Sequence, residues 1–325
     1  MLPNTLTRVP GRPAFTAPLP AIAHRINSNR HAREFPPQAG GTAGHRPRCA
    51  RLCAVPTAET EPAVVVAAPA ARPVRAISRF ARRATVRRSL RLLGSFRFEQ
   101  TDPALFYGGL AADSAAMIGD FYADVTGHGL EGATILDVGG GPGYFADEFV
   151  KTGARYIPVE PDSSEMHAAG LSVAGAVRGS GMALPIRDNA VDICFSSNVA
   201  EHVSQPWVMA DEMVRVTRPG GLIVLSYTVW HGPFGGHETG PWHYLGGEYA
   251  ARRYRRKTGR EPKNRFGKSL FAVGAVDGLR WAASTSADVH ILFPRYHPRW
   301  AWWVVHIPVL RELLVSNLVV VATKP

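Results

Sequence analysis

The stretch Ile135-Leu-Asp-Val-Gly-Gly-Gly-Pro-Gly-Tyr-Phe145 decides the fold of this chain, because it joins an apolar run to a glycine-rich turn and a helix start. Ile135, Leu136 and Val138 are typical of a buried strand in a parallel sheet. The glycines permit positive φ angles and let the backbone approach a ligand closely. The helix expected after the turn would point free N–H groups at that ligand. The stretch therefore predicts a nucleotide-binding turn.

The spacing of the glycines narrows the kind of nucleotide. Gly139, Gly141 and Gly143 alternate after Asp137, so the Gly-x-Gly-x-x-Gly spacing of dinucleotide-binding turns is not met. A carboxylate at the strand end can accept a hydrogen bond from a ligand's amino group or hold the N–H groups of the turn, but it would repel a diphosphate. The turn therefore favours a nucleoside that carries an amino acid over NAD or ATP.

Five motifs in order resemble those of class I S-adenosylmethionine (SAM) dependent methyltransferases of the type 11 kind. After the glycine turn come Tyr156-Ile-Pro-Val-Glu160, Met182-Ala-Leu-Pro-Ile186, Val191-Asp-Ile-Cys-Phe-Ser-Ser-Asn-Val-Ala-Glu-His202 and Glu212-Met-Val-Arg-Val-Thr-Arg-Pro-Gly-Gly-Leu-Ile-Val-Leu225. Over most of residues 79–325 the chain also resembles uncharacterised actinobacterial (mycobacterial) methyltransferases. The resemblance implies SAM as the cofactor.

The resemblance also implies which side chains hold the cofactor. The glycine turn would meet the methionine end of SAM, and Glu160 would hold the ribose hydroxyls, although a solvated strand end is the alternative for Glu160. Ser180 stands where many relatives have an acidic residue for the adenine amine, and it can still accept a hydrogen bond. Met182 is either an adenine contact or a core residue. The implied cofactor residues are Asp137, Gly139, Gly141, Gly143, Glu160, Ser180 and Met182. Asn198 is added to them because it follows an expected strand, and ligands bind at the carboxyl ends of parallel strands.

Apolar runs alternate with helical segments along the chain, which predicts an α/β fold with a Rossmann-like sheet and helices on both faces. The resemblance implies a seven-stranded, mostly parallel sheet whose last strand is antiparallel and inserted between its neighbours. Phe106 and Tyr107 could wall the SAM pocket or pack in the core. We expect strands at 135–138, 156–160, 176–178, 191–196, 222–227, 289–293 and 317–322, and helices at 79–93, 113–126 and 272–283.

Two domains are expected. Residues 1–75 are rich in Pro, Ala and Arg without sustained periodicity, which predicts a disordered extension. This extension has three interpretations: a transit peptide, a disordered basic tail, or a non-native segment that results from a start assigned too early. The third interpretation is favoured. Residues 76–325 form the methyltransferase domain, with a lid insertion at 231–270 and a Trp-rich insertion at 296–314.

The insertions supply the candidate substrate and catalytic residues. Trp242, His243 and Tyr244 in the lid are assigned to the substrate. Trp300, Trp302 and Trp303 beside Arg299 are either an interfacial anchor or core packing. A base is needed only for an acceptor that arrives protonated. The candidates are His202, which could instead only shape the pocket, and then His237 and Glu238. No spacing of Cys or His predicts a metal site.

The composition of the chain indicates which binding partners and which cellular compartment to expect. The chain has 37 Lys and Arg against 26 Asp and Glu, a net charge of +11. Basic clusters at 79–91 and 252–257 either face phosphates or are solvated helix faces. The three cysteines make no disulfide framework, and no signal peptide or membrane-spanning run is found. A cytoplasmic location is therefore expected, with a membrane-peripheral location as the alternative.

Three functions follow from these patterns. The leading hypothesis is methyl transfer from SAM by in-line displacement to a small-molecule or lipid-like acceptor. An RNA or DNA methyltransferase is the first alternative, but residues 197–200 read Ser-Asn-Val-Ala rather than the Asn/Asp-Pro-Pro-Tyr/Phe type for exocyclic amines, so nucleic acid is disfavoured. The second alternative is a catalytically silent membrane-surface or scaffold protein. The oligomeric state is left open.

Overall fold

Seven strands form one sheet in the order β3-β2-β1-β4-β5-β7-β6. The computed structural model describes residues 78–98, 101–162 and 175–325, and these belong to one structural unit. The strands from β3 to β5 run parallel, whereas β7 is antiparallel to both β5 and β6. The predicted fold is thereby confirmed. The strands are β1 (Thr134–Val138), β2 (Arg155–Glu160), β3 (Val177–Arg178), β4 (Val191–Ser197), β5 (Thr217–Thr228), β6 (Asp288–Pro294) and β7 (Asn317–Thr323).

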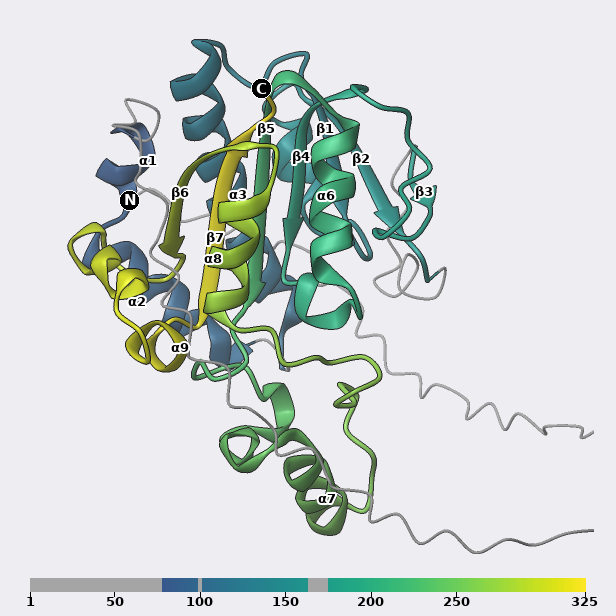
Figure 1. Ribbon diagram of the computed structural model, residues 1–325, viewed down its shortest axis with the longest axis vertical. Coiled ribbons are helices and arrows are strands. Elements are labelled where there is room, and N and C mark those ends of the chain that lie inside the picture. Colours follow the sequence, from purple (N-terminus) through teal and green to yellow (C-terminus); the bar gives the residue numbers. More distant parts are fainter. Residues whose placement is uncertain (1–77, 99–100, 163–174) are drawn as a thin grey trace, which may run out of the picture. The chain divides into compact units, whose positions relative to one another are not determined.

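Helices cover both faces of this sheet (Figure 1). Leu136 points to the face covered by α6 and α8, and Ile135 to the face covered by α1, α3 and α4, as the alternation of a strand requires. The α-helices in the described residues are α1 (Ser78–Arg83), α2 (Val86–Ser95), α3 (Pro103–Thr126), α4 (Ala146–Val150), α6 (Pro206–Val216), α7 (Gly247–Thr258), α8 (Ala275–Ser284) and α9 (Leu310–Leu314). None of the helices described is long and apolar enough to cross a bilayer.

The three predicted helices have other boundaries. The helix expected at 79–93 is two helices, because Thr85 is extended and its side chain caps α2 by accepting a hydrogen bond from Arg88 N. The helix expected at 113–126 already begins at Pro103, where Asp102 caps α3. The helix expected at 272–283 begins after Gly274 as α8. The extension predicted at residues 1–75 lies outside the described residues.

The two predicted insertions follow β5 and β6. The first contains the short 3-10 helices η4 (His237–Thr239) and η5 (Trp242–Leu245) and then α7, and it lies at the end of the sheet where β5 ends (Figure 1). The second contains η6 (Arg299–His306) and α9. Trp302 of η6 stacks on Phe293 at 4.6 Å between ring centroids, so it is a core residue. Trp300 and Trp303 are 70% and 50% exposed.

Candidate functional site

The glycine turn leaves β1 at the carboxyl edge of the parallel strands, where ligands bind in open α/β sheets. Gly139, Gly141 and Gly143 have φ angles of 78°, 50° and 87°, a region that strongly favours glycine. A Cβ on Gly139 would lie 2.5 Å from the side chain of Val199. A Cβ on Gly141 would meet no described atom within 4 Å. The turn is therefore packed at Gly139 and open at Gly141.

Glu160 lies beside the open part of this turn. It ends β2, the neighbour of β1, and its carboxylate accepts hydrogen bonds from Gly141 N and Asp162 N, both at 3.2 Å. The side chain is half-buried. A carboxylate of this kind can accept from two adjacent hydroxyl groups.

Asp137 lies beneath the turn. It is buried, and its carboxylate accepts a hydrogen bond from the Tyr156 hydroxyl at 2.5 Å. Burial raises the pKa of Asp137 to about 7, and the nearby charge of Glu160 adds to this rise, whereas the hydrogen bond from Tyr156 opposes it. The contact of Asp137 with the methionine end of a cofactor stays a prediction.

The raised pKa of Asp137 predicts a pH-dependent stability. The folded state binds the proton of the Asp137 carboxyl more tightly than the unfolded state does. The resulting stabilisation of the folded state is fully present below about pH 4 and is lost as the pH rises through about 7. The rise of this pKa from 3.8 to about 7 corresponds to about 4 kcal/mol of unfolding free energy. Asp137→Asn should remove this part of the slope. Urea denaturation of both proteins at about pH 5 and about pH 8 measures the difference, and identical slopes would contradict it.

Ser180 and Met182 lie in the turn that follows β3. The Ser180 hydroxyl accepts a hydrogen bond from Met182 N at 3.2 Å, and Gly179 N donates to the carbonyl of Glu160. Met182 is half-buried and packs against the core on the α6 side. The turn therefore adjoins the end of β2, and the roles of Ser180 and Met182 at an adenine stay predictions.

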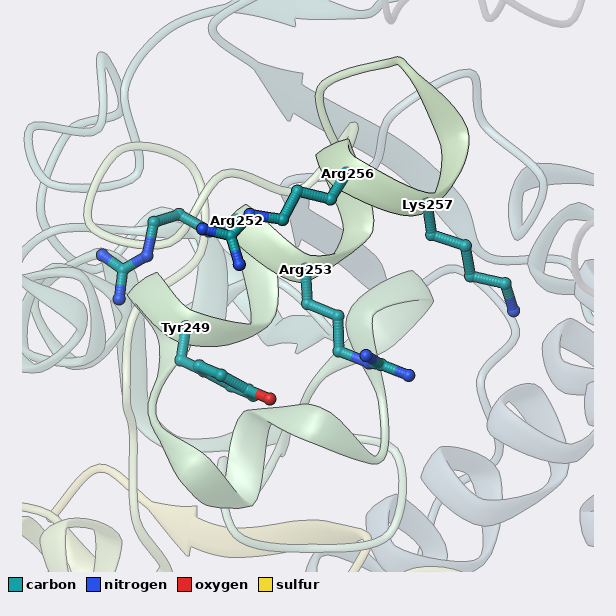
Figure 2. A pocket seen from close by; sticks show the side chains of 5 residues that line it. All are labelled: Tyr249, Arg252, Arg253, Arg256 and Lys257. Atoms are coloured by element: carbon teal, nitrogen blue, oxygen red, sulfur yellow. The ribbon is translucent and has the colours of Figure 1, made fainter.

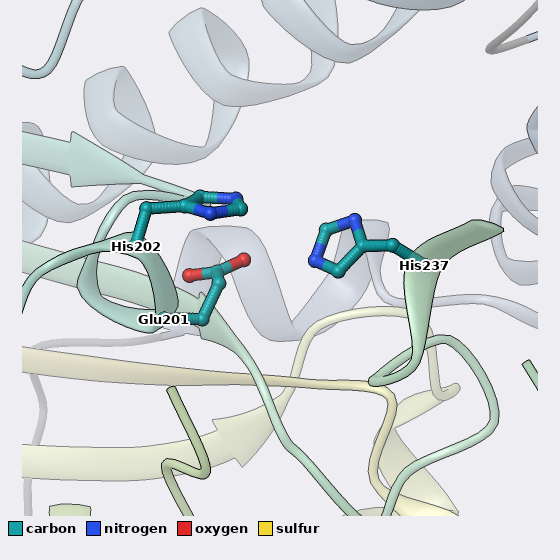
Figure 3. A group of neighbouring side chains, drawn as sticks. All are labelled: Glu201, His202 and His237. Carbon is teal, nitrogen blue, oxygen red and sulfur yellow. The ribbon is translucent and has the colours of Figure 1, made fainter. Parts of the chain in front are cut away.

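Two of the three candidate catalytic residues come together. His202 in η3 (Ala200–His202) and His237 in η4 have ring centroids 5.1 Å apart, and the carboxylate of Glu201 lies beside the His202 ring (Figure 3). The third candidate, Glu238, is bound by Asn264 instead. Its carboxylate accepts hydrogen bonds from N and Nδ2 of Asn264, both at 2.8 Å. Burial lowers the pKa of His237, so its imidazole is neutral at neutral pH.

Comparison with known proteins identifies the family. The model of a methyltransferase domain matches residues 136–225. An uncharacterised methyltransferase of Mycobacterium tuberculosis (strain H37Rv) is 64% identical over 248 residues, which cover 75% of this chain and 97% of the relative. The chain belongs to this methyltransferase family. A relative from Mycobacterium marinum is 63% identical over 75% of this chain and 96% of its own.

Among solved structures, that of a SAM-dependent methyltransferase from Mesorhizobium loti is similar with a TM-score of 0.41 and 17% identity. The match covers 60% of this methyltransferase and 92% of the solved chain. The family implies SAM as the cofactor, and the open face at Gly141 beside the Glu160 carboxylate fits an aminoacyl nucleoside with two ribose hydroxyls.

The predicted substrate residues of the methyltransferase lie on η5 and differ in exposure. His243 is buried, its Nε2 lies 3.3 Å from the carbonyl of Gly232, and burial lowers its pKa. Trp242 and Tyr244 are exposed, and the Arg253 guanidinium lies 3.8 Å from the ring centroid of Trp242. Contact of these three residues with a substrate stays a prediction. Figure 2 shows the basic cluster of α7 around a shallow hollow, lined by Tyr249, Arg252, Arg253, Arg256 and Lys257.

Aromatic contacts tie other elements of the methyltransferase to this edge. Tyr107 of α3 stacks on Tyr144, the residue after Gly143, with ring centroids 4.8 Å apart. Phe96 stacks on Phe234 of the first insertion at 4.1 Å. The insertion and the segment before α3 are therefore in direct contact, and Tyr107 lies against the glycine turn, as a wall of the cofactor pocket would.

A buried polar network behind the site was missed by the sequence reasoning. Arg295 at the end of β6 is buried and donates to the hydroxyls of Ser114, Ser197 and Ser226. Asn317 donates to Oδ1 of Asn198, which has a φ of 57°. The network thereby positions Asn198 at the end of β4. The only signal in the sequence was a cation directly after the apolar run that forms β6.

Proposed function

We propose that this methyltransferase binds SAM at the glycine turn and methylates a small-molecule or lipid-like acceptor beside it. The observation that carries the proposal is the open face at Gly141 directly beside the Glu160 carboxylate. The turn admits a ligand there without a Cβ in its way. The carboxylate offers acceptors to ribose hydroxyls.

The chemistry divides between the cofactor and the chain. SAM would supply a methyl group on a sulfonium, which an acceptor attacks in line. Glu160 and the turn orient the nucleoside. For an acceptor that arrives protonated, His202 and His237 are the groups that can take the proton. The Nδ1 of His202 lies 2.6 Å from the carbonyl of Ser269, so Nδ1 carries the hydrogen and Nε2 is the basic atom.

An exposed apolar surface supports an acceptor in or near a lipid layer. Arg299 N donates to the carbonyl of Ala84 at 2.8 Å, so η6 begins against the junction of α1 and α2. Exposed Arg87 and Arg91 of α2 accompany the apolar side chains, a combination that suits an anionic interface. The exposed apolar residues of α2, η6, α9 and their junction are Val86, Leu90, Leu93, Trp300, Trp303, Ile307, Val309, Leu313 and Leu314.

The basic cluster of α7 supports the alternative of a nucleic acid acceptor, and one assay separates the candidates. Purified protein is incubated with methyl-labelled SAM and, in parallel, a total lipid extract, a small-metabolite extract and total RNA. We expect label in the lipid or metabolite fraction, and less with Glu160→Ala. Label in RNA alone would overturn the acceptor class. No transfer in any arm, with SAM binding intact, would favour the silent scaffold.

A further inference from the structure

We propose that Glu201, His202 and His237 bind a divalent transition-metal ion of the zinc class. One potential ligand atom from each residue lies within 4.8 Å of the other two. Glu201 and His202 come from the turn after β4, and His237 faces them from the insertion after β5 (Figure 3). Their separation along the chain explains why spacing in the sequence predicted no metal site.

Of the three residues, Glu201 gives the strongest evidence for a bound cation. Its side chain is 1% exposed, and Oε1 accepts a hydrogen bond from Thr228 N at 3.1 Å. Oε2 is buried and has no hydrogen-bond partner among the described residues. A buried carboxylate oxygen without a partner is costly, and a bound cation would remove that cost. Oε1 is therefore anchored to the end of β5, and Oε2 is left to bind.

The hydrogen bond that His202 makes through Nδ1 leaves Nε2 as the nitrogen that can bind a metal ion. Because Nδ1–H donates to the carbonyl of Ser269 at 2.6 Å, the neutral ring has its lone pair on Nε2. Metal-binding histidines usually donate their second ring N–H to a carbonyl or carboxylate in this way, which fixes the tautomer and the ring orientation.

His237 supplies the third atom from the opposite side. Its Nε2 is buried without a hydrogen-bond partner among the described residues. His237 also has a φ of 46°, in the left-handed region, which the insertion must hold against its ordinary preference.

The ligand set selects the class of ion. Two imidazoles and one carboxylate suit zinc and neighbouring transition metals, whereas calcium and magnesium prefer oxygen ligands. Atoms bound to one zinc are at most about 4.2 Å apart, so small side-chain rotations must close the group. Three protein ligands leave a coordination position open, as in catalytic rather than structural zinc sites.

The three ligand residues lie near the glycine turn, so an ion bound to them could take part in catalysis. Val199, two residues before Glu201, contacts the place where a Cβ of Gly139 would be, so the group adjoins the glycine turn. An acceptor hydroxyl at the open position would have its pKa lowered by the ion, in place of a histidine base. This consequence rests on the proposed function, whereas ion binding does not.

Zinc titration of the full-length, chelator-treated protein tests the proposal. Binding is measured by competition with a chromophoric zinc chelator, and cobalt(II) replaces zinc to report ligand geometry by visible absorption. We expect one tight ion per chain. Glu201→Gln and His237→Ala should each weaken binding by about 100-fold, whereas His128→Ala, at an exposed histidine, should not.

Zinc affinity that is the same in wild type, Glu201→Gln and His237→Ala would place the ion elsewhere and overturn the proposal, as would the absence of binding. Should Glu201→Gln fail to fold, His237→Ala in the peripheral insertion decides. S-adenosylhomocysteine (SAH) binding, measured on the same samples, separates the two claims. SAH binding without zinc binding contradicts only the metal site, and zinc binding without SAH binding contradicts only the proposed function.

Discussion

Replacing Glu160 with alanine is expected to weaken SAH binding by at least about 100-fold. Hydrogen bonds to a charged group contribute about 1.5–3 kcal/mol each, and two ribose hydroxyls would lose their acceptor. The substitution also removes the bond from Gly141 N that holds the open part of the turn toward β2. Calorimetric titration of SAH into the variant and the wild type measures the change in Kd.

Glu131→Ala is the matched control for this substitution. Glu131 is an exposed glutamate before β1, at the end of that strand opposite the glycine turn. Its removal should leave the Kd for SAH unchanged. Equal affinities of the Glu160 variant and the wild type would show that this carboxylate does not hold the nucleoside.

Asp113→Asn is expected to lower the free energy of unfolding by about 3–5 kcal/mol. The buried carboxylate of Asp113 accepts two hydrogen bonds from Arg88, both at 2.7 Å, and lies 4.0 Å from Nη2 of Arg295. Without its charge, two buried guanidinium groups lose their counter-ion. Urea denaturation measures the loss, provided that the m-value is unchanged.

Asp120→Asn controls for the loss of an ion pair on the same helix. Asp120 of α3 pairs with Arg83, whose side chain is 60% exposed. Exposed pairs contribute little, so this variant should lose less than about 1 kcal/mol. Similar losses at Asp113 and Asp120 would mean that the buried network contributes no more than a surface pair.

Much of the fold was predictable because its signals are local. The apolar runs that begin at Ile135 and Val191 are each interrupted by only one aspartate. The turn between β1 and α4 needs glycine at Gly139, because a Cβ there would collide with the side chain of Val199. A cofactor role for Glu160 was implied by the family resemblance, whereas the hydrogen bond that its carboxylate accepts from Gly141 N is visible only in the folded chain. The break between α1 and α2 was missed because Thr85 reads equally well as a helical residue.

The rest of the site depends on contacts that the sequence cannot display. Arg295 is a strand-end cation in the sequence, and only folding brings it to Ser114 and Ser197. His237 of the insertion after β5 meets His202 of the turn after β4 only in the folded chain. Side chains that meet through tertiary folding have no fixed spacing, so residue type alone could nominate both histidines but could not group them with Glu201.

Binding of SAH to the full-length wild-type protein tests the central claim most directly, because that claim is that the glycine turn and Glu160 form a SAM site. The measurement is calorimetric titration with SAH, repeated in the presence of SAM. We expect saturable binding of one SAH per chain that SAM displaces. A folded protein that binds neither SAH nor SAM would contradict it.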